Sequence, residues 1–347
     1  MSSRLSYMDK LKGICIMLVV FCHYTILPGA TVVGNIIMTL AWAAVPCFMM
    51  ITGGLLCRKD SFDWKKYIIK LVTLYLVIVL WRIIYISVYI IMNGDIYLHK
   101  DIISSVLFMT DINGIDMGVF WYMKAYLITY IVYPAVWFLF RNGGRKFLLC
   151  LMAAAGFSGI LIPALNILMV RYADFSIYNM IYITPFLNYP NMIFYFMLGA
   201  FLLEYREYIH DKLNRIMPLV IFVVGLILLV LVKYSDTGTF SWNWIYLNEG
   251  YSRISTLIMS LGLYLCFDFY CSSKESIFGK VVGQSTMGIY YMHYIILAVC
   301  NKYLYPSVGV EYITVTANIL KTIVITFVCV ILTIIIKKIP VLKKMIM

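Results

Sequence analysis

Long apolar runs, separated by short polar segments, account for most of this chain. Each run has about 17–25 residues, which lets an α-helix cross the roughly 30 Å of hydrocarbon in a bilayer. We predict ten transmembrane helices, at residues 13–29, 34–56, 68–92, 117–140, 147–170, 186–204, 216–232, 252–270, 285–302 and 313–336. The predicted fold class is therefore all-α, a polytopic membrane helix bundle.

Composition supports a membrane protein. The 347 residues are 63% hydrophobic and 13% charged, values that exclude an ordinary soluble domain. We expect one integral membrane domain over residues 1–347, with no appended soluble domain. The first apolar run contains a histidine and an acidic start and lacks a small-residue cleavage pattern, so we expect it to be retained rather than cleaved as a signal peptide.

The basic residues are distributed unevenly between the two sides of the predicted bundle. Most of the 28 lysines and arginines fall in segments that share a side with the N-terminus. This bias predicts that both termini are cytoplasmic. It also explains the net charge of +12 without a nucleic-acid partner. Arg82, Lys124 and Lys321 lie within predicted spans, and we expect them to face the bundle interior, water or each other.

Cysteine usage gives no sign of a metal site. The nine cysteines include no Cys-x-x-Cys pair, and all fall within predicted helices or near their cytoplasmic ends. We therefore expect neither a disulfide framework nor a bound metal.

The first predicted helix, residues 7–25, carries the most informative polar residues. Asp9 and Lys12 lie at its start, and His23 lies inside the apolar run that follows. Lys12 and His23 are eleven residues apart, which at about 100° per residue is nearly three turns, so both project from one face about 16 Å apart. The pattern predicts a charged cluster at the membrane surface in line with a deeper imidazole.

The stretch Asp9-x-x-Lys12-Gly13-Ile14 with His23 resembles the N-terminal motif of the acyltransferase 3 family of integral membrane acyltransferases. An arginine usually stands where this chain has Lys12. Four later segments resemble further family motifs, in order: Val45-Pro46-Cys47-Phe48-Met49-Met50-Ile51-Thr52-Gly53, Phe120-Trp121-Tyr122, Phe196-Met197-Leu198-Gly199-Ala200 and the stretch from Gly283 to His293. Many members have Arg-x-x-Arg after the second span; here Lys66 to Lys70 follows, with Tyr67 where the first arginine falls.

The resemblance implies a function that the apolar pattern alone does not. Members transfer an acyl group, usually acetyl from acetyl-CoA, to a hydroxyl of a polysaccharide or lipid-linked glycan of the cell envelope. It implies a multi-pass protein of a bacterial plasma membrane, with acyl-CoA, the glycan acceptor and membrane lipid as partners and no metal cofactor.

Three residues are candidates for catalysis. Transfer from a thioester to a hydroxyl needs a base or an acyl-carrying nucleophile, and donors for the oxyanion. His23 suits either of the first two roles, and the alternative is a structural histidine bonded to a neighbouring helix. His293 lies at a similar depth in the ninth apolar run. We expect it either to share a cavity with His23 or to be a packing histidine. We expect Lys124 either to pair with an acid or to donate a hydrogen bond to the oxyanion.

Five residues are candidates for holding acyl-CoA. Asp9 and Lys12 suit the anionic end of the donor, with a topology anchor and a helix-end charge as alternatives. Lys65, Lys66 and Lys70 suit its phosphates as point charges, although positive-inside topology explains each of them equally well.

Several other polar residues receive weaker assignments. Ser285 is predicted to cap a helix, and Tyr290 to donate a hydrogen bond. Trp242 and Trp244 belong to an interfacial aromatic belt or stack on sugar rings. Four residues receive no site role: His99 and His210 in loops, and Glu204 and Asp268 as surface charges at helix ends.

Two other functions remain open. The first is a small-solute transporter on the same helix set, which would not need the line from Lys12 to His23. The second is an accessory subunit with a degenerate site, which Lys12 and the missing arginine pair keep under consideration.

Overall fold

The computed structural model describes residues 5–23, 32–94, 99–112, 114–115, 117–173, 189–237, 250–271, 274–304, 314–340 and 342–346. These residues are almost entirely helical. They contain no β-strand, and their one extended pairing is an isolated bridge between Ile112 and Ile115. Trp242, Trp244 and the end of the first predicted span, residues 24–29, lie outside the described residues.

The helices follow the predicted apolar runs closely. Their bounds are α1 Ser6–His23, α2 Val32–Ala41, α3 Ala44–Cys57, α4 Trp64–Asn93, α5 His99–Phe108, α6 Trp121–Arg141, α7 Arg145–Gly156, α8 Ile162–Ala173, α9 Pro190–Glu204, α10 Arg206–Lys212, α11 Met217–Thr237, α13 Ile254–Tyr270, α14 Ile277–Val281, α15 Thr286–Val299 and α17 Val315–Lys338. Short 3-10 or π segments are η1 Gly118–Phe120, η2 Phe157–Leu161, η5 Gly283–Ser285, η6 Cys300–Leu304 and η7 Leu342–Ile346.

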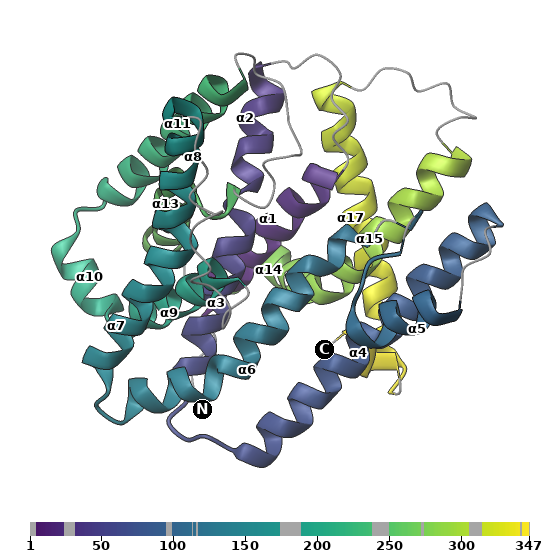
Figure 1. Cartoon of the computed structure of the whole chain (residues 1–347), viewed down its shortest axis with the longest axis horizontal. Helices are drawn as coiled ribbons and strands as arrows, with labels where there is room; N and C mark the ends of the chain where they lie inside the picture. The colour runs from purple at the N-terminus through teal and green to yellow at the C-terminus, as the bar shows by residue number, and fades with distance from the viewer. Residues whose placement is uncertain are drawn as a thin grey trace.

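Helix α1 lies at the centre of the bundle, where α3, α13, α14, α15 and α17 pack around it (Figure 1). Leu11, Cys15, Ile16 and Val20 of α1 have no exposed surface. Apolar residues therefore surround α1 on several sides, which fits its apolar sequence. The polar residues of α1 are held inside the protein by this packing.

Helices α3 and α9 pack closely because each presents a glycine to the other. A Cβ at Gly53 would lie 1.8 Å from the Phe196 carbonyl oxygen, and one at Gly199 would lie 1.9 Å from the Met50 carbonyl oxygen. Small residues of this kind let two helix backbones approach, as they do in membrane bundles. Both glycines belong to motifs that the sequence analysis identified.

Helix α4 begins and ends with clear capping residues. The Asp63 side chain accepts a hydrogen bond from the Lys66 backbone N–H, and Gly94 closes the helix with a φ of 73°. The 30 residues between them include Lys65, Lys66 and Lys70 in the first two turns. The Asp63 cap thereby holds these three lysines at one end of the helix.

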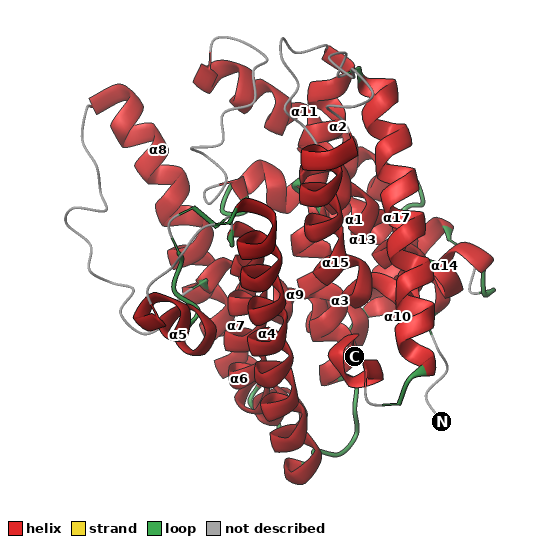
Figure 2. Cartoon of the chain, turned by 90° about the vertical axis from the view of Figure 1, so that its right-hand side faces the viewer, coloured by secondary structure: helices red, strands yellow, loops and turns green. Residues whose placement is uncertain are grey.

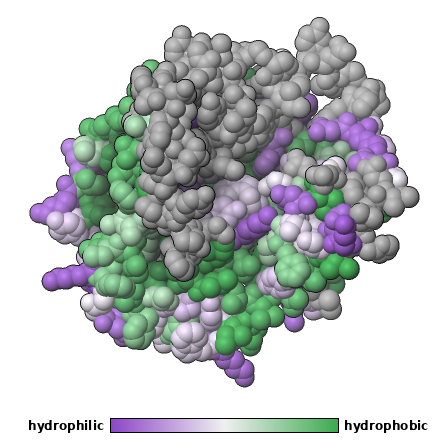
Figure 3. Space-filling view, in the orientation of Figure 1, coloured by the Kyte–Doolittle hydropathy of each residue, from purple (hydrophilic) through white to green (hydrophobic). Residues whose placement is uncertain are grey.

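The outer surface of the described bundle is apolar enough for contact with lipid. Large apolar side chains are exposed along α4 and α17, including Leu76, Ile83, Leu320 and Phe327. The face in Figure 3 carries wide apolar areas where it is described. Surface of this extent is costly in water, so the bundle fits a membrane.

The predicted number of spans is not confirmed. Five described helices are long and apolar enough to cross a membrane, or six if α10 and α11, which meet at 92°, count as one span. Each predicted run does contain a helix, but several are short. Helix α9, for example, has 15 residues, or about 22 Å, less than the hydrocarbon thickness.

The C-terminal segment returns to the end of the bundle where α1 begins (Figure 2). The Trp81 indole donates a hydrogen bond of 2.8 Å to the Met345 carbonyl oxygen. Ile346 is 3% exposed and lines the same cavity as Asp9 and Lys12. The beginning of α1 and η7 therefore share one end of the bundle, as two cytoplasmic termini require.

Candidate active site

A cavity of about 570 Å³ follows one face of α1. Asp9 and Lys12 line one part of it, and His23, eleven residues further along the helix, lines another. The other lining residues used below are Leu55, Trp121, Tyr122, Tyr251, Gly283, Gln284, Tyr290, Lys337 and Ile346. The helical spacing that placed these three polar residues on one face thus corresponds to one continuous cavity.

The structure brings the two predicted histidines together. The imidazole centroids of His23 and His293 are 5.2 Å apart, and the Tyr294 ring lies 5.3 Å from His23. His293 is 1% exposed, whereas His23 is half-buried and lines the cavity. His23 is therefore the member of the pair that a ligand in the cavity reaches, with His293 behind it.

The contacts of His293 determine which of its nitrogens carries the proton in the neutral ring. Nδ1 lies 3.0 Å from the Ile289 carbonyl oxygen and 2.7 Å from that of Tyr290. A carbonyl oxygen only accepts, so Nδ1 must donate, and the lone pair is then on Nε2. Nε2 is buried and has no hydrogen-bond partner among the described residues. It is thus a buried acceptor on a ring that packs beside the His23 ring.

The other end of the cavity is polar and tightly built. Lys12 Nζ lies 3.4 Å from Asp9 Oδ1, and Lys337 Nζ donates to the Gln284 carbonyl oxygen at 2.8 Å. A Cβ at Gly283 would lie 1.9 Å from the Asp9 carbonyl oxygen, so the glycine permits this close approach. Lys337 lies in the last turn of α17, and only the packing of α17 against α1 brings its ammonium group to this cavity.

A second cavity, of about 740 Å³, adjoins the first. Asp9, Lys12 and Leu55 line both. The basic residues of the second cavity are Lys12, Arg58, Lys59, Lys66 and Lys70, and its acidic residues are Asp9, Asp60 and Asp63. The excess of basic groups favours an anionic ligand. Lys65 is exposed on α4 and is not among the described lining residues of either cavity.

The charges in this second cavity affect one another. Partial desolvation, together with the nearby ammonium groups of Lys70 and Lys66, lowers the pKa of Lys59. The hydrogen bonds that Asp63 accepts from the Lys66 backbone and side chain lower the pKa of the Asp63 carboxyl. An anion bound among the three lysines would relieve the repulsion on Lys59.

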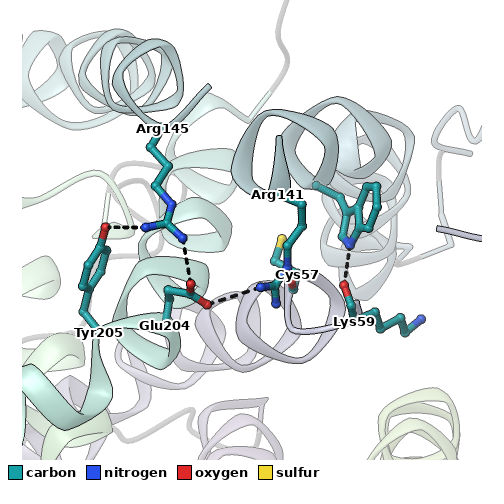
Figure 4. Close-up of polar contacts among 7 residues, drawn as sticks. Cys57, Lys59, Arg141, Arg145, Glu204 and Tyr205 are labelled. Atoms are coloured by element: carbon teal, nitrogen blue, oxygen red, sulfur yellow. Dashed lines mark hydrogen bonds and ion pairs between the residues drawn. The ribbon is translucent and has the colours of Figure 1, made fainter. Parts of the chain in front are cut away.

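Glu204 joins several helix ends next to the second cavity. Its carboxylate lies 2.9 Å from Arg145 and 3.7 Å from Arg141, and Arg141 Nε donates to the Cys57 carbonyl oxygen at 3.0 Å (Figure 4). The Trp137 indole donates to the Lys59 carbonyl oxygen at 2.8 Å. Glu204 is therefore more than the isolated surface charge predicted, because it ties α6, α7 and α9 to the end of α3.

Lys124 is not brought to the His23 cavity. Its Nζ lies 3.9 Å from Asp111 Oδ1, and it lines a separate groove with Tyr189 and apolar residues. The predicted pairing with an acid is present, whereas an oxyanion role beside His23 has no geometric support. The helical repeat of α6 places Trp121, Tyr122 and Tyr126 on the side that lines the cavity, whereas Lys124 projects from another side.

An aromatic wall, which the sequence analysis did not assign to the cavity, closes it near His23. Trp121 and Tyr251 stack at 5.1 Å with an interplanar angle of 30°, and Tyr122 and Tyr290 lie 5.4 Å apart. The Tyr290 hydroxyl donates to the Val119 carbonyl oxygen, so it is a donor as predicted, but toward the backbone. Tyr251 lies shortly before α13, and only tertiary packing brings its ring to the cavity.

Three further predictions, for two intramembrane charges and one helix cap, have clear outcomes. Arg82 is fully buried, as expected for a charge facing the bundle interior. Lys321 is only half-buried on α17. Ser285 occupies the N-cap position of α15, but its side chain makes no capping hydrogen bond there.

The predictions for Asp268 and His210 are wrong. Asp268 is 6% exposed rather than a surface charge, and its carboxylate contacts Arg206 Nε at 2.6 Å and His210 Nε2 at 2.8 Å. His210 lies in α10 rather than in a loop. The reason is the 92° bend between α10 and α11, which folds α10 against the end of α13. His99 begins α5, also not a loop.

The described residues include no group of three or more His, Cys, Asp or Glu side chains that could hold a metal ion. The fold and the cavity define a membrane-embedded helix bundle with a polar, basic end and an imidazole pair, of which His23 lines the cavity and His293 is buried. The chain matches the acyltransferase 3 family, described as an acyltransferase domain, over residues 5–338, and it belongs to this family. It is accordingly a membrane acyltransferase. No curated protein and no solved structure matches the chain significantly.

Proposed function

We propose that this protein transfers an acetyl group from cytosolic acetyl-CoA to a hydroxyl of a cell-envelope polysaccharide or lipid-linked glycan. The observation that carries the proposal is the shared cavity of Lys12 and His23. Their separation of about 16 Å along α1 suits an elongated donor, with an anionic nucleotide at one end and a thioester at the other.

Each cavity has a role in this proposal. The basic second cavity holds the phosphates of CoA through Lys59, Lys66 and Lys70, and Asp9 and Lys12 lie where the two cavities join. The pantetheine arm then extends along α1 to place the thioester beside His23. Lys337 adds a second ammonium group near the junction. The acceptor hydroxyl reaches the same point from the opposite side of the membrane.

Two chemical routes use the histidine pair. In the first, His23 removes the proton from the acceptor hydroxyl, whose oxygen attacks the thioester carbonyl carbon; the C–S bond breaks, and the CoA thiolate takes up the proton. In the second, the neutral His23 attacks the thioester carbonyl carbon, the C–S bond breaks, and CoA leaves as its thiol with the imidazole proton; the acceptor hydroxyl oxygen then attacks the acyl-histidine, the C–N bond breaks, and the hydroxyl proton returns to the imidazole. In both, the His293 ring packs beside His23 and helps to orient it.

The test uses purified protein in liposomes, with radiolabelled acetyl-CoA on the cytoplasmic side, candidate glycan acceptors on the other side, and orientation checked by protease. Wild type is compared with His23→Ala, and with His99→Ala as the same change on α5. We expect wild type and His99→Ala to cleave the thioester and His23→Ala to lose cleavage at matched folding. Equal CoA release by wild type and His23→Ala would contradict the mechanism and bring the transporter alternative forward.

Acid-quenched samples taken without acceptor distinguish the two routes. Label retained on the protein of wild type but not of His23→Ala supports the acyl-histidine route. Cleavage that requires acceptor, with no label retained on the protein, supports the base route.

A further inference from the structure

Four aromatic rings lie beside the lysines of the second cavity, and no step of the proposed reaction uses them. Phe62, Tyr67, Tyr130 and Tyr133 line this cavity together with the lysines. Cationic side chains suit phosphate groups, whereas aromatic faces suit flat, apolar rings. A ligand that matches this lining therefore carries both anionic groups and a flat ring.

Tyr67 and Tyr130 form a stacked pair in this cavity. Their ring centroids are 5.4 Å apart, and the ring planes meet at 17°. Tyr130 is 7% exposed, whereas Tyr67 is half-buried. Tyr130 thus supports Tyr67 from the protein side, and Tyr67 is the member of the pair that a ligand in the cavity reaches.

The orientation of the Tyr67 ring is fixed by further contacts. The Phe62 ring lies 5.5 Å away and the Tyr133 ring 6.3 Å away. The Tyr67 hydroxyl donates to the Ile131 carbonyl oxygen at 3.4 Å. A side chain that is already held in place loses little conformational freedom when a ligand stacks on it. Tyr67 is therefore a preorganised aromatic platform.

Lysines flank this platform along α4. Lys66 precedes Tyr67 directly, and Lys70 follows it by three residues, about one helical turn. Both line the same cavity as Tyr67, and so does Lys59 from the segment between α3 and α4. A ligand with phosphates among these lysines thus has a neighbouring group close to the Tyr67 ring.

A row of tyrosines on α6 continues from the platform into the first cavity. Tyr122, Tyr126 and Tyr130 follow one another at intervals of four residues, and neighbouring rings lie 6.2 Å and 6.3 Å apart. Tyr122 and Tyr126 line the first cavity, and Tyr130 lines the second. An elongated ligand with one end at Tyr67 can therefore follow this row toward His23.

We propose that Tyr67 is the platform on which the adenine base of the acyl donor stacks. The phosphates of the donor then lie among Lys59, Lys66 and Lys70. Bases stack on aromatic side chains through their π faces, a contact that does not depend on charge. Tyr67 stands where many family members have an arginine, so this chain has a stacking contact in place of a charge there. The inference rests on the proposed function, because it locates the base of acetyl-CoA in the second cavity.

The test measures binding to the full-length protein in phosphatidylcholine nanodiscs by calorimetry. One ligand is adenosine 3′,5′-bisphosphate, and the other is the same ribose bisphosphate with a methoxy group in place of the base. Tyr67→Leu removes the ring and Tyr67→Phe keeps it. Tyr208→Leu is the matched control, at a tyrosine on α10 that is 61% exposed.

We expect Tyr67→Leu to bind the nucleotide about tenfold more weakly than wild type, as loss of one base–aromatic contact predicts. Tyr67→Phe should recover most of this affinity, and Tyr208→Leu should bind as wild type does. Wild type and Tyr67→Leu should bind the ligand without a base equally, and more weakly than wild type binds the nucleotide. Lys70→Met should weaken both ligands by a similar factor, because it removes a charge that only the phosphates use.

Three results would each overturn the proposal. They are equal nucleotide binding by wild type and Tyr67→Leu, an equal loss of both ligands in Tyr67→Leu, and a loss in Tyr208→Leu as large as that in Tyr67→Leu. Cleavage of acetyl-CoA on the same samples separates this inference from the proposed reaction. Base-dependent binding through Tyr67 without cleavage would support the platform and contradict the reaction.

Discussion

At the scale of single residues, the protonation of His293 is determined by its contacts. The Ile289 and Tyr290 carbonyl oxygens accept from Nδ1, so the lone pair lies on Nε2 of a ring that packs beside the His23 ring. A neutral imidazole with a fixed tautomer orients a neighbouring imidazole without adding charge. His293 is thus a positioning residue whose loss should affect turnover more than donor binding.

We predict that His293→Asn lowers kcat by about 100-fold, in line with the lower range for acid–base assistance. The amide of asparagine can still donate to the Tyr290 carbonyl oxygen, so stability should be kept. The KM for acetyl-CoA should change little, because the donor site lies elsewhere in the cavity. Steady-state kinetics and a thermal melt measure these effects.

His99→Asn provides the matched control and should leave kcat unchanged. A fall in the melting temperature of His293→Asn that matches its fall in activity would show a purely structural role. An unchanged kcat would remove His293 from the mechanism.

The lysines of the second cavity predict a pH dependence. Desolvation and the Lys70 and Lys66 charges lower the pKa of Lys59, so this residue loses its proton at a lower pH than the ordinary value of about 10.4. A deprotonated lysine no longer attracts phosphate. Affinity for acetyl-CoA should therefore fall as the pH rises from 7 toward that value, measured by calorimetry at constant ionic strength.

Lys70→Met tests the cause of this pH dependence. Removing the Lys70 charge raises the pKa of Lys59, so the fall in affinity should begin at a higher pH, from a lower starting affinity. A pH profile that does not move between wild type and Lys70→Met would contradict the repulsion among these lysines.

At the scale of helices, close packing depends on glycines that the apolar pattern does not reveal. A side chain at Gly199 would overlap the Met50 carbonyl oxygen, and one at Gly53 would overlap that of Phe196. Helix α3 also lines the cavity, with Phe48 and Leu55 among the lining residues. The two glycines thus bring α9 against a helix that lines the proposed donor site.

We predict that Gly199→Val destabilises the protein by about 1–3 kcal/mol through overpacking, seen as a lower melting temperature in detergent. Ala153→Val adds a side chain on the exposed face of α7 and should change the melting temperature little. A Gly199→Val protein as stable as Ala153→Val would show that the α3–α9 contact relaxes without cost.

At the scale of the whole molecule, the basic residues and both ends of the described chain lie toward one end of the bundle. Basic residues are concentrated on the side of the N-terminus, and the start of α1 and η7 lie at one end of the bundle (Figure 2). The second cavity, with its excess of basic residues, adjoins this same end. A cytosolic donor would meet the protein there.

We predict that both termini are cytoplasmic. Peptide tags at the N- and C-termini should be digested by protease added to inside-out vesicles and protected in right-side-out vesicles. A tag inserted after Asn93, at the other end of α4, should show the reverse pattern. Opposite accessibility of the two terminal tags would require an odd number of spans and a different bundle.

The sequence by itself determined the local features of this protein. Helices follow from long apolar runs, and the shared face of Asp9, Lys12 and His23 follows from helical geometry, because both depend only on neighbouring residues. The resemblance to the acyltransferase 3 family rested on motifs of the same local kind. Whether each helix is long enough to cross the membrane did not follow from the sequence, since short helices such as α9 are stabilised by packing.

Tertiary structure decided which distant residues meet. Asp268 is buried because the bend between α10 and α11 brings Arg206 and His210 against it. His293 meets His23, and Lys124 lies in its own groove, because helix packing sets the direction in which each side chain points. Contacts between residues far apart in the chain depend on how whole helices cross, and no spacing along one helix contains that information.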